Sequence, residues 1–164
     1  MATAQYLAAV KSSGKDPVDV QRETPGVIAE LIKGVSREEL RRKPAPGKWS
    51  VSEIVAHLAE DEIVQLWRYR QMLENPGVAL AGFDQDKWAQ LGDYGSREIG
   101  DSLELFRLLR ESNVAMFGKL SEKEWHSNGV HGERGPMTVR SLMEHMAGHD
   151  LNHLEQIKRI LKKK

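Results

Sequence analysis

The stretch WSVSEIVAHLAEDEIVQLWRYRQMLENPG, residues 49–77, decides the fold because it is the most strongly marked helix in the chain. Ser50 and Glu53 form an S-x-x-E capping box, and Trp49 stands where a hydrophobic staple packs. Asn75-Pro76-Gly77 ends the helix. Apolar side chains between these ends share one stripe at helical spacing: Val51, Val55, Leu58, Leu66, Tyr69 and Leu73. The segment therefore predicts a long amphipathic helix with one buried face.

Three further segments show the same signals, and they cover residues 16–32, residues 96–120 and the chain from Thr138 onward. The first has Asp16 as its cap and a proline at the first helical position, although Pro25 should kink or restart it. Ser96 caps the second. Short turns are expected at 36–40 and 121–125. No segment shows the alternation of a β-strand.

The chain also carries a weak internal repeat. VSREEL…GKWSVSEIVAHL (35–58) matches LSEKEW…GPMTVRSLMEHM (120–146) in the order of a short turn, a loop, a cap and a helix. His57 falls opposite His145 in this alignment. We therefore predict an all-α, up-and-down four-helix bundle with a pseudo-two-fold repeat, formed as one domain by residues 1–164.

Composition excludes several classes of function. The 164 residues are 40% hydrophobic, and 24 basic residues balance 24 acidic ones, so the chain lacks the positive charge of a general nucleic-acid binder. The basic tail, residues 158–164, is interpreted as a last turn that complements the helix dipole. Because the chain has no cysteine, disulfides and thiolate metal sites are excluded, and a metal would need His, Asp or Glu ligands.

No segment approaches the ~18 consecutive apolar residues of a membrane span. The N-terminus has no charged leader before its short apolar run. We therefore expect a cytoplasmic protein without a membrane partner.

The connecting segments suggest a pocket mouth. Residues 76–95 should form a long ordered loop or a short helix that could roof a pocket. Asp84 and Asp86 are interpreted as turn formers that could also touch a substrate. His126 and His131 lie in a glycine-rich region and are expected to be solvated. The mouth itself should combine the KPAPGK, FDQDKWAQ and VHGERGP loops.

GHDLNHLEQI, residues 148–157, places two histidines on a face that should be buried. On a helical wheel, His149 and His153 fall inside or beside the arc of Leu142, Met146, Ile157 and Ile160. Two imidazoles one turn apart, ~6 Å along the axis, can reach one metal ion. His145 could pair with His149 instead, but the wheel favours His149 with His153.

A third ligand must come from another helix. His57 is the natural candidate, although its position at the edge of the stripe leaves the geometry equivocal. Asp61, one turn further on, could accept the second N–H of the ring and orient it. Glu62 lies near the middle of the buried face, so it either moves a proton in catalysis or pairs with an arginine of this or another helix.

KWSVSEIVAHLAEDE followed by TVRSLMEHMAGHDLNHLEQI resembles the DinB-like superfamily, which includes the YfiT group named as metal-dependent hydrolases. The resemblance extends from about Pro17 to Ile160 and includes the intervening FDQDKWAQ and LFRLLRES segments. It implies a four-helix bundle, often dimeric, that holds a divalent metal on three histidines. Transferred to this sequence, the ligands would be His57, His149 and His153.

Three imidazoles would leave an open position on the metal, with Zn or Ni expected first, and a bound water or thiol would become a nucleophile. Relatives in the family imply either transfer of a low-molecular-weight thiol, slightly preferred on that precedent, or hydrolysis. A thiol would have to arrive as a cosubstrate, because the chain has no cysteine. We expect a small-molecule substrate and a homodimer. One alternative is a non-catalytic stress-response protein that binds a metal or a small ligand, and another is a purely structural bundle with histidines in its core.

Overall fold

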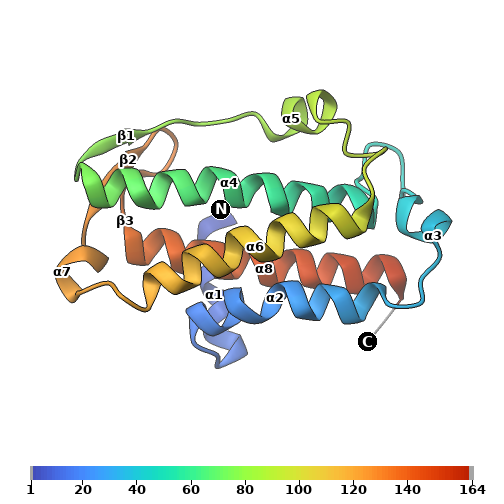
Figure 1. The fold of residues 1–164 in the computed structure, drawn as a ribbon, viewed down its shortest axis with the longest axis horizontal. Helices are drawn as coiled ribbons and strands as arrows, with labels where there is room; N and C mark the ends of the chain where they lie inside the picture. The colour runs from blue at the N-terminus through green and yellow to red at the C-terminus, as the bar shows by residue number, and fades with distance from the viewer. Residues whose placement is uncertain (1, 163–164) are drawn as a thin grey trace.

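The computed structural model describes residues 2–162, and its body is a bundle of four long helices (Figure 1). These are α2 (Pro17–Ile32), α4 (Val51–Glu74), α6 (Ile99–Phe117) and α8 (Val139–Leu161). The described residues also form four shorter helices: α1 (Ala2–Ser13), α3 (Arg37–Arg41), α5 (Gln85–Leu91) and α7 (Glu122–Trp125). The predicted four-helix bundle is confirmed, and α3 and α7 are the two expected short turns.

The helix directions follow from the connections (Figure 1). α2 and α4 run in opposite directions, and so do α6 and α8, whereas α4 and α6 run the same way because residues 75–98 return along the bundle. The alternation expected from the sequence therefore holds within each pair. Among the four long helices, the most extensive contacts join α4 to α6 and α2 to α8. The pair α2 and α4 thus packs against the pair α6 and α8 through two equivalent contacts, as expected if a two-fold axis relates the two repeats.

Local signals set the helix ends. The capping box at the start of α4 is complete, because Glu53 N–H donates to Ser50 Oγ at 3.3 Å and Ser50 N–H donates to Glu53 Oε2 at 2.7 Å. α6 differs from the prediction: Ser96 bonds to Asp93, and the helix starts after Glu98, which makes no side-chain cap. α8 ends at Leu161 with the expected basic last turn. Lys163 and Lys164 lie outside the described residues.

A small three-stranded sheet closes one end of the bundle, which corrects the expectation of no strands. β1 (Val78–Leu80) pairs in parallel with β2 (Asn128–His131), and β2 pairs antiparallel with β3 (Gly135–Thr138). Strands of three and four residues are too short to give a readable alternation. Gly129 is needed where the strands meet α4, because a Cβ there would lie 2.9 Å from the Leu80 side chain.

Apolar side chains gather in two main clusters at the two halves of the bundle. One is built around Ile54, Leu58 and Ile157, and the other around Tyr69 and Leu142. The middle of α4 between them buries polar side chains instead: His57, Asp61, Glu62, Gln65 and Arg68. The polar residues that sequence analysis found on a buried face therefore share one zone inside the bundle.

Helix α1 packs across α8, an arrangement that the sequence did not predict. A Cβ at Gly148 would lie 2.4 Å from both the Cβ and the carbonyl oxygen of Tyr6, so glycine is required for this approach. The Tyr6 ring consequently stacks near His145 and His149, with centroid distances of 5.0 and 5.8 Å. Among the described residues, no helix combines the length and apolarity needed to cross a membrane.

Candidate metal centre

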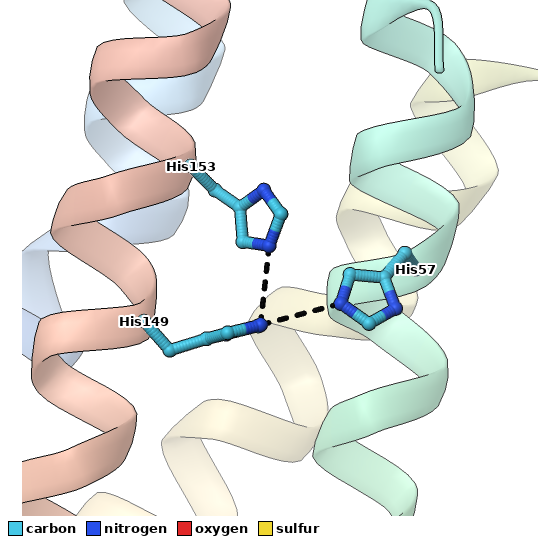
Figure 2. Close-up of side chains that lie close together, drawn as sticks. All are labelled: His57, His149 and His153. Atoms are coloured by element: carbon cyan, nitrogen blue, oxygen red, sulfur yellow. Dashed lines mark hydrogen bonds between the residues drawn. The ribbon is translucent and has the colours of Figure 1, made fainter. Parts of the chain in front are cut away.

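Three histidines converge inside the bundle (Figure 2). His57 comes from α4, and His149 and His153 lie one turn apart on α8. His149 Nε2 is 3.3 Å from His57 Nε2 and 3.1 Å from His153 Nε2. Tetrahedral bonds of about 2.0–2.1 Å would set ligand nitrogens about 3.3 Å apart. The helices therefore bring the three predicted ligands together at the spacing of a shared ion.

Hydrogen bonding alone leaves this cluster unsatisfied. His149 Nε2 carries either one hydrogen or one lone pair, so it can complete only one of its two contacts with neighbouring rings. His153 Nδ1 lies 3.0 Å from Gln156 Oε1, a contact in which the ring nitrogen must be the donor, so the Nε2 lone pair faces the cluster. A cation at the centre would engage all three lone pairs at once.

Burial keeps the three rings neutral. It lowers the pKa of His57 to about 3 and that of His153 to about 4, and it lowers the pKa of His149 well below its ordinary value. The neighbouring imidazoles add to this effect for His57 and His149. Neutral imidazole is the form that binds a metal, so near pH 7 no proton has to be displaced from these rings.

The two predicted carboxylates have different surroundings. Asp61 Oδ2 lies 3.8 Å from His149 Nδ1, so it faces His149 rather than His57, the ring that it was expected to orient. Burial raises the pKa of Asp61 to about 6. Glu62 is not brought to the histidines: its carboxylate accepts from Arg110 at 2.9 Å and from Asn113 at 2.7 Å. The alternative reading of Glu62, as the partner of an arginine on another helix, matches the structure.

A cavity of about 430 Å³ opens beside the cluster. His57, Asp61 and His149 form one part of its wall, and residues 82–85 cover it, as expected of the predicted roof loop. Asp84 caps α5, which agrees with its interpretation as a turn former. His126 is exposed as expected, but His131 is buried and lines the cavity, because it ends the inward-facing alternation of β2.

Arg134 lies in the VHGERGP loop expected at the pocket mouth, and it lines the cavity. Four other wall residues were not identified from the sequence: Tyr6, Gln65, Arg68 and His145 as a pocket residue. They come from α1, α4 and α8, and only the fold brings these three helices to one cavity.

A second hollow of about 260 Å³ reaches the cluster from another side. Its wall contains His149 and His153 together with Trp49 and Gln156, and Gly47 and Lys48 come from the predicted KPAPGK loop. His149 lines both spaces, so the histidine cluster is accessible from two directions.

Comparisons with known proteins agree with this architecture. The sequence model of the DinB superfamily matches residues 22–157. A protein of Oceanobacillus iheyensis named "putative metal-dependent hydrolase" is 26% identical over 131 residues, which cover 80% of this chain and 75% of the relative. A protein of the same name from Geobacillus thermodenitrificans is 25% identical over 164 residues, which cover 99% and 90% of the two chains.

The fold has a solved counterpart in YfiT from Bacillus subtilis, described as a "probable metal-dependent hydrolase with an unusual four-helix bundle topology". The two structures align with a TM-score of 0.81 at 19% identity, over 90% of this chain and 87% of YfiT. Residues 22–157, which match the DinB superfamily model, contain all four long helices apart from the start of α2 and the end of α8. The chain therefore belongs to the DinB superfamily.

Proposed function

We propose that the protein is a metal-dependent hydrolase in which His57, His149 and His153 hold one divalent ion, with Zn²⁺ or Ni²⁺ as the first candidates. The observation that carries the proposal is the convergence of three neutral, buried ring nitrogens beside a cavity. Three nitrogen ligands leave a coordination position free, which is characteristic of catalytic rather than structural sites. The names of the relatives support hydrolysis as the reaction.

When bound, the ion would supply Lewis acidity that brings the pKa of a coordinated water or thiol toward neutrality. The chain's own residues would do the rest. Gln156 fixes the ring of His153 through Nδ1, and Trp49 packs on the ring of His57 with centroids 4.9 Å apart. Both contacts restrict the ligand side chains to orientations that face the centre, which lowers the entropy lost on binding.

Asp61 is the residue that we assign to proton handling. Its Oδ2 lies on the cavity wall 3.8 Å from His149 Nδ1, close enough to hold that ring electrostatically and to accept a proton from a reacting group in the cavity. Gln65 Nε2 donates to Asp61 Oδ1 at 3.0 Å and fixes the carboxyl group. Glu62 has no part in this proposal, because Arg110 and Asn113 occupy both of its oxygens.

Thiol transfer is the second candidate, and the two-sided access to the cluster favours it. The larger cavity and the second hollow could hold an electrophile and a thiol cosubstrate on different sides of His149. The absence of cysteine requires that the thiol come from outside the chain. A non-catalytic metal- or ligand-binding protein is the remaining alternative. The homodimer, the small-molecule substrate and the cytoplasmic location stay predictions.

Two activity screens on the metal-loaded, untagged protein separate these possibilities. Turnover of esters or amides that disappears in His149→Ala/His153→Ala supports hydrolysis. Turnover that requires an added thiol and an electrophile supports transfer instead. Silence in both screens, with a full complement of metal, would favour the non-catalytic protein.

A further inference from the structure

The far wall of the larger cavity carries positive charge without a counter-charge in contact. We call Gln65, Arg68, His131, Arg134 and His145 the polar wall. On α4, His57, Asp61, Gln65 and Arg68 follow one another along a single face, so the cavity extends from the histidine cluster toward Arg68. Eleven residues separate His57 from Arg68, or about 16 Å along the helix axis. A small molecule of moderate length could reach both ends.

Arg68 is a buried cation that lacks a carboxylate partner. Its side chain is 4% exposed, and its one hydrogen bond runs from Nη2 to the carbonyl oxygen of Ala81 at 2.6 Å. Nε has no partner, and within the described residues no carboxylate lies within 4.0 Å of the guanidinium. Burying a charge without a partner is strongly unfavourable, so such a group in a cavity indicates that a ligand supplies the missing charge.

Arg134 reinforces this charge from the β2–β3 turn. Its Nη1 contacts His131 Nε2 at 3.3 Å, and it too has no ion pair with any described residue. Burial lowers the pKa of Arg68, the charges of Asp61 and Glu133 oppose that effect, and the charge of Arg134 lowers the pKa further, so the two guanidinium groups lie within electrostatic reach of each other. Asp61, Asp84 and Glu133 also line the cavity, but none of them pairs with either arginine.

The polar wall also contains hydrogen-bonding atoms without partners. Gln65 Oε1, Arg68 Nε and His145 Nδ1 are all buried and unpaired. If the internal repeat that sets His57 opposite His145 is continued, Asp61 and Gln65 fall opposite His149 and His153. His145, Asp61 and Gln65 are therefore the repeat counterparts of His57, His149 and His153. The second set converges as the proposed metal ligands, and two members of the first set, Gln65 and His145, belong to the polar wall.

We propose that the polar wall binds an oxyanion, a carboxylate or a phosphate, on the small-molecule substrate, with Arg68 and Arg134 as the specificity-determining residues. Gln65 and His145 bind polar atoms in the middle of that molecule, and the bond to be broken lies at the other end, beside His57 and His149. The assignment of a substrate class rests on the proposed metal-dependent function. Binding of the oxyanion itself needs only the arginines.

The experiment follows the Arg68 Nε–H group directly by ¹⁵N NMR, with its signal identified by its loss in Arg68→Lys. Butyrate, butyramide and inorganic phosphate are titrated at constant ionic strength, once with a chelator and once after metal loading. We expect a saturable shift with butyrate, phosphate or both, with and without metal, and none with neutral butyramide. The oxyanion with the larger affinity identifies which of the two the wall prefers.

Variants test the assignment of residues. A charge-assisted hydrogen bond contributes enough that Arg68→Met should weaken oxyanion binding about 10-fold or more. Arg134→Met should also weaken it, and because Arg134 is exposed this variant keeps its fold if Arg68→Met does not. Arg107→Met, on the outer face of α6, is the matched control with unchanged binding.

Metal content separates oxyanion binding by the polar wall from metal binding by the three histidines. Both cavity variants should load the same amount of metal as the wild type, whereas a protein that never binds metal should still bind the oxyanion in chelator. The proposal is overturned if neither oxyanion gives a saturable shift, if butyramide gives an equal one, or if Arg68→Met and Arg134→Met both bind as the wild type does.

Discussion

Two polar clusters lie side by side in the core of this bundle, and they treat their charges in opposite ways. Asp61 and His149 belong to the histidine cluster, whereas the very next residues, Glu62 and Asp150, belong to a network around Arg110. Arg110 is 1% exposed and donates to both carboxylates. In the histidine cluster, the Nδ1 atoms of His57 and His149 have no hydrogen-bond partner, and Asp61 Oδ2 lies 3.8 Å from His149 Nδ1.

The Arg110 network also uses a defect in α2. Pro25 has no N–H to bond the carbonyl of Gln21 one turn earlier, although α2 runs unbroken through it. That carbonyl oxygen accepts from Arg110 Nη1 at 2.9 Å instead. The proline that sequence analysis expected to restart the helix therefore provides an acceptor for the buried arginine.

The two clusters differ in how many of their buried polar atoms are paired, and this distinguishes residues that stabilise the core from residues that are available to a ligand. Charges that are paired within the protein specify how the helices pack, as around Arg110. Both terminal nitrogens of its guanidinium group donate to carboxylates, and only its Nε lacks a partner. Polar atoms that remain unpaired after folding, as in the histidine cluster and at Arg68, lower stability and are retained where a ligand completes them.

The largest expected effect comes from opening the closed network. Arg110→Met leaves Glu62 and Asp150 buried without a cation, so the free energy of unfolding should fall by about 3–5 kcal/mol in urea denaturation. Adding Glu62→Gln and Asp150→Asn should restore part of the loss by removing the uncompensated charges. A loss within experimental error for Arg110→Met would show that the two clusters do not differ in this way.

Acid should destabilise the metal-free protein through the open cluster. Burial lowers the pKa of four histidines in the folded chain: His57, His145, His149 and His153. Below about pH 6.5 these rings become protonated in the unfolded chain but stay neutral in the folded chain. Stability present above that pH is lost as the pH falls toward 4. Burial lowers the pKa of His131 as well. Burial raises the pKa of Asp61 to about 6 and also raises that of Asp150, so two carboxyl groups oppose the effect of five histidines.

We expect the free energy of unfolding to drop by about 2 kcal/mol between pH 6.5 and 5.5 in chelator, since each histidine can contribute up to about 1.4 kcal/mol per pH unit. Urea denaturation at both pH values measures this. His145→Gln, which leaves the three proposed ligands intact, should reduce the slope. A stability that is flat or rises toward pH 5.5 would contradict the neutral, buried state of these rings.

The smallest effect concerns the carboxylate that faces the open cluster. Asp61→Asn keeps the shape of the side chain but removes the charge near His149 Nδ1, so metal affinity should fall about 10- to 100-fold. Competition with a chromophoric chelator measures this change. Glu60→Gln is a control on the same helix, because Glu60 pairs with Arg97 and Tyr94 away from the cluster. Equal affinity in both variants would remove Asp61 from the site.

The sequence predicted the long helices and the pair His149 and His153, because caps and a buried stripe are local features. It left His57 at the edge of its stripe, and only the family resemblance selected that residue. The structure explains the ambiguity: His57 points across toward α8 and packs on Trp49, so its burial depends on a partner helix rather than on its own.

The cavity could not be predicted in the same way. Tyr6 reaches it because Gly148 lets α1 approach α8, and His131 reaches it through a four-residue strand. Arg68 reads on the sequence as one of several charges near the end of a helix, and its lack of a partner is visible only when all surrounding elements are in place. Contacts between distant segments, rather than any periodic pattern, determine this part of the molecule.

Binding of one metal ion by His57, His149 and His153 is measured by the metal content of the purified protein. Untagged protein is incubated with Zn²⁺ or Ni²⁺, desalted and measured by elemental analysis. A site of this kind should retain about one equivalent of metal per chain. The wild type and His145→Ala should both retain it, and it should be lost in His149→Ala/His153→Ala and strongly reduced in His57→Ala. Metal that is absent from the wild type, or undiminished in the double variant, would contradict metal binding by the three histidines.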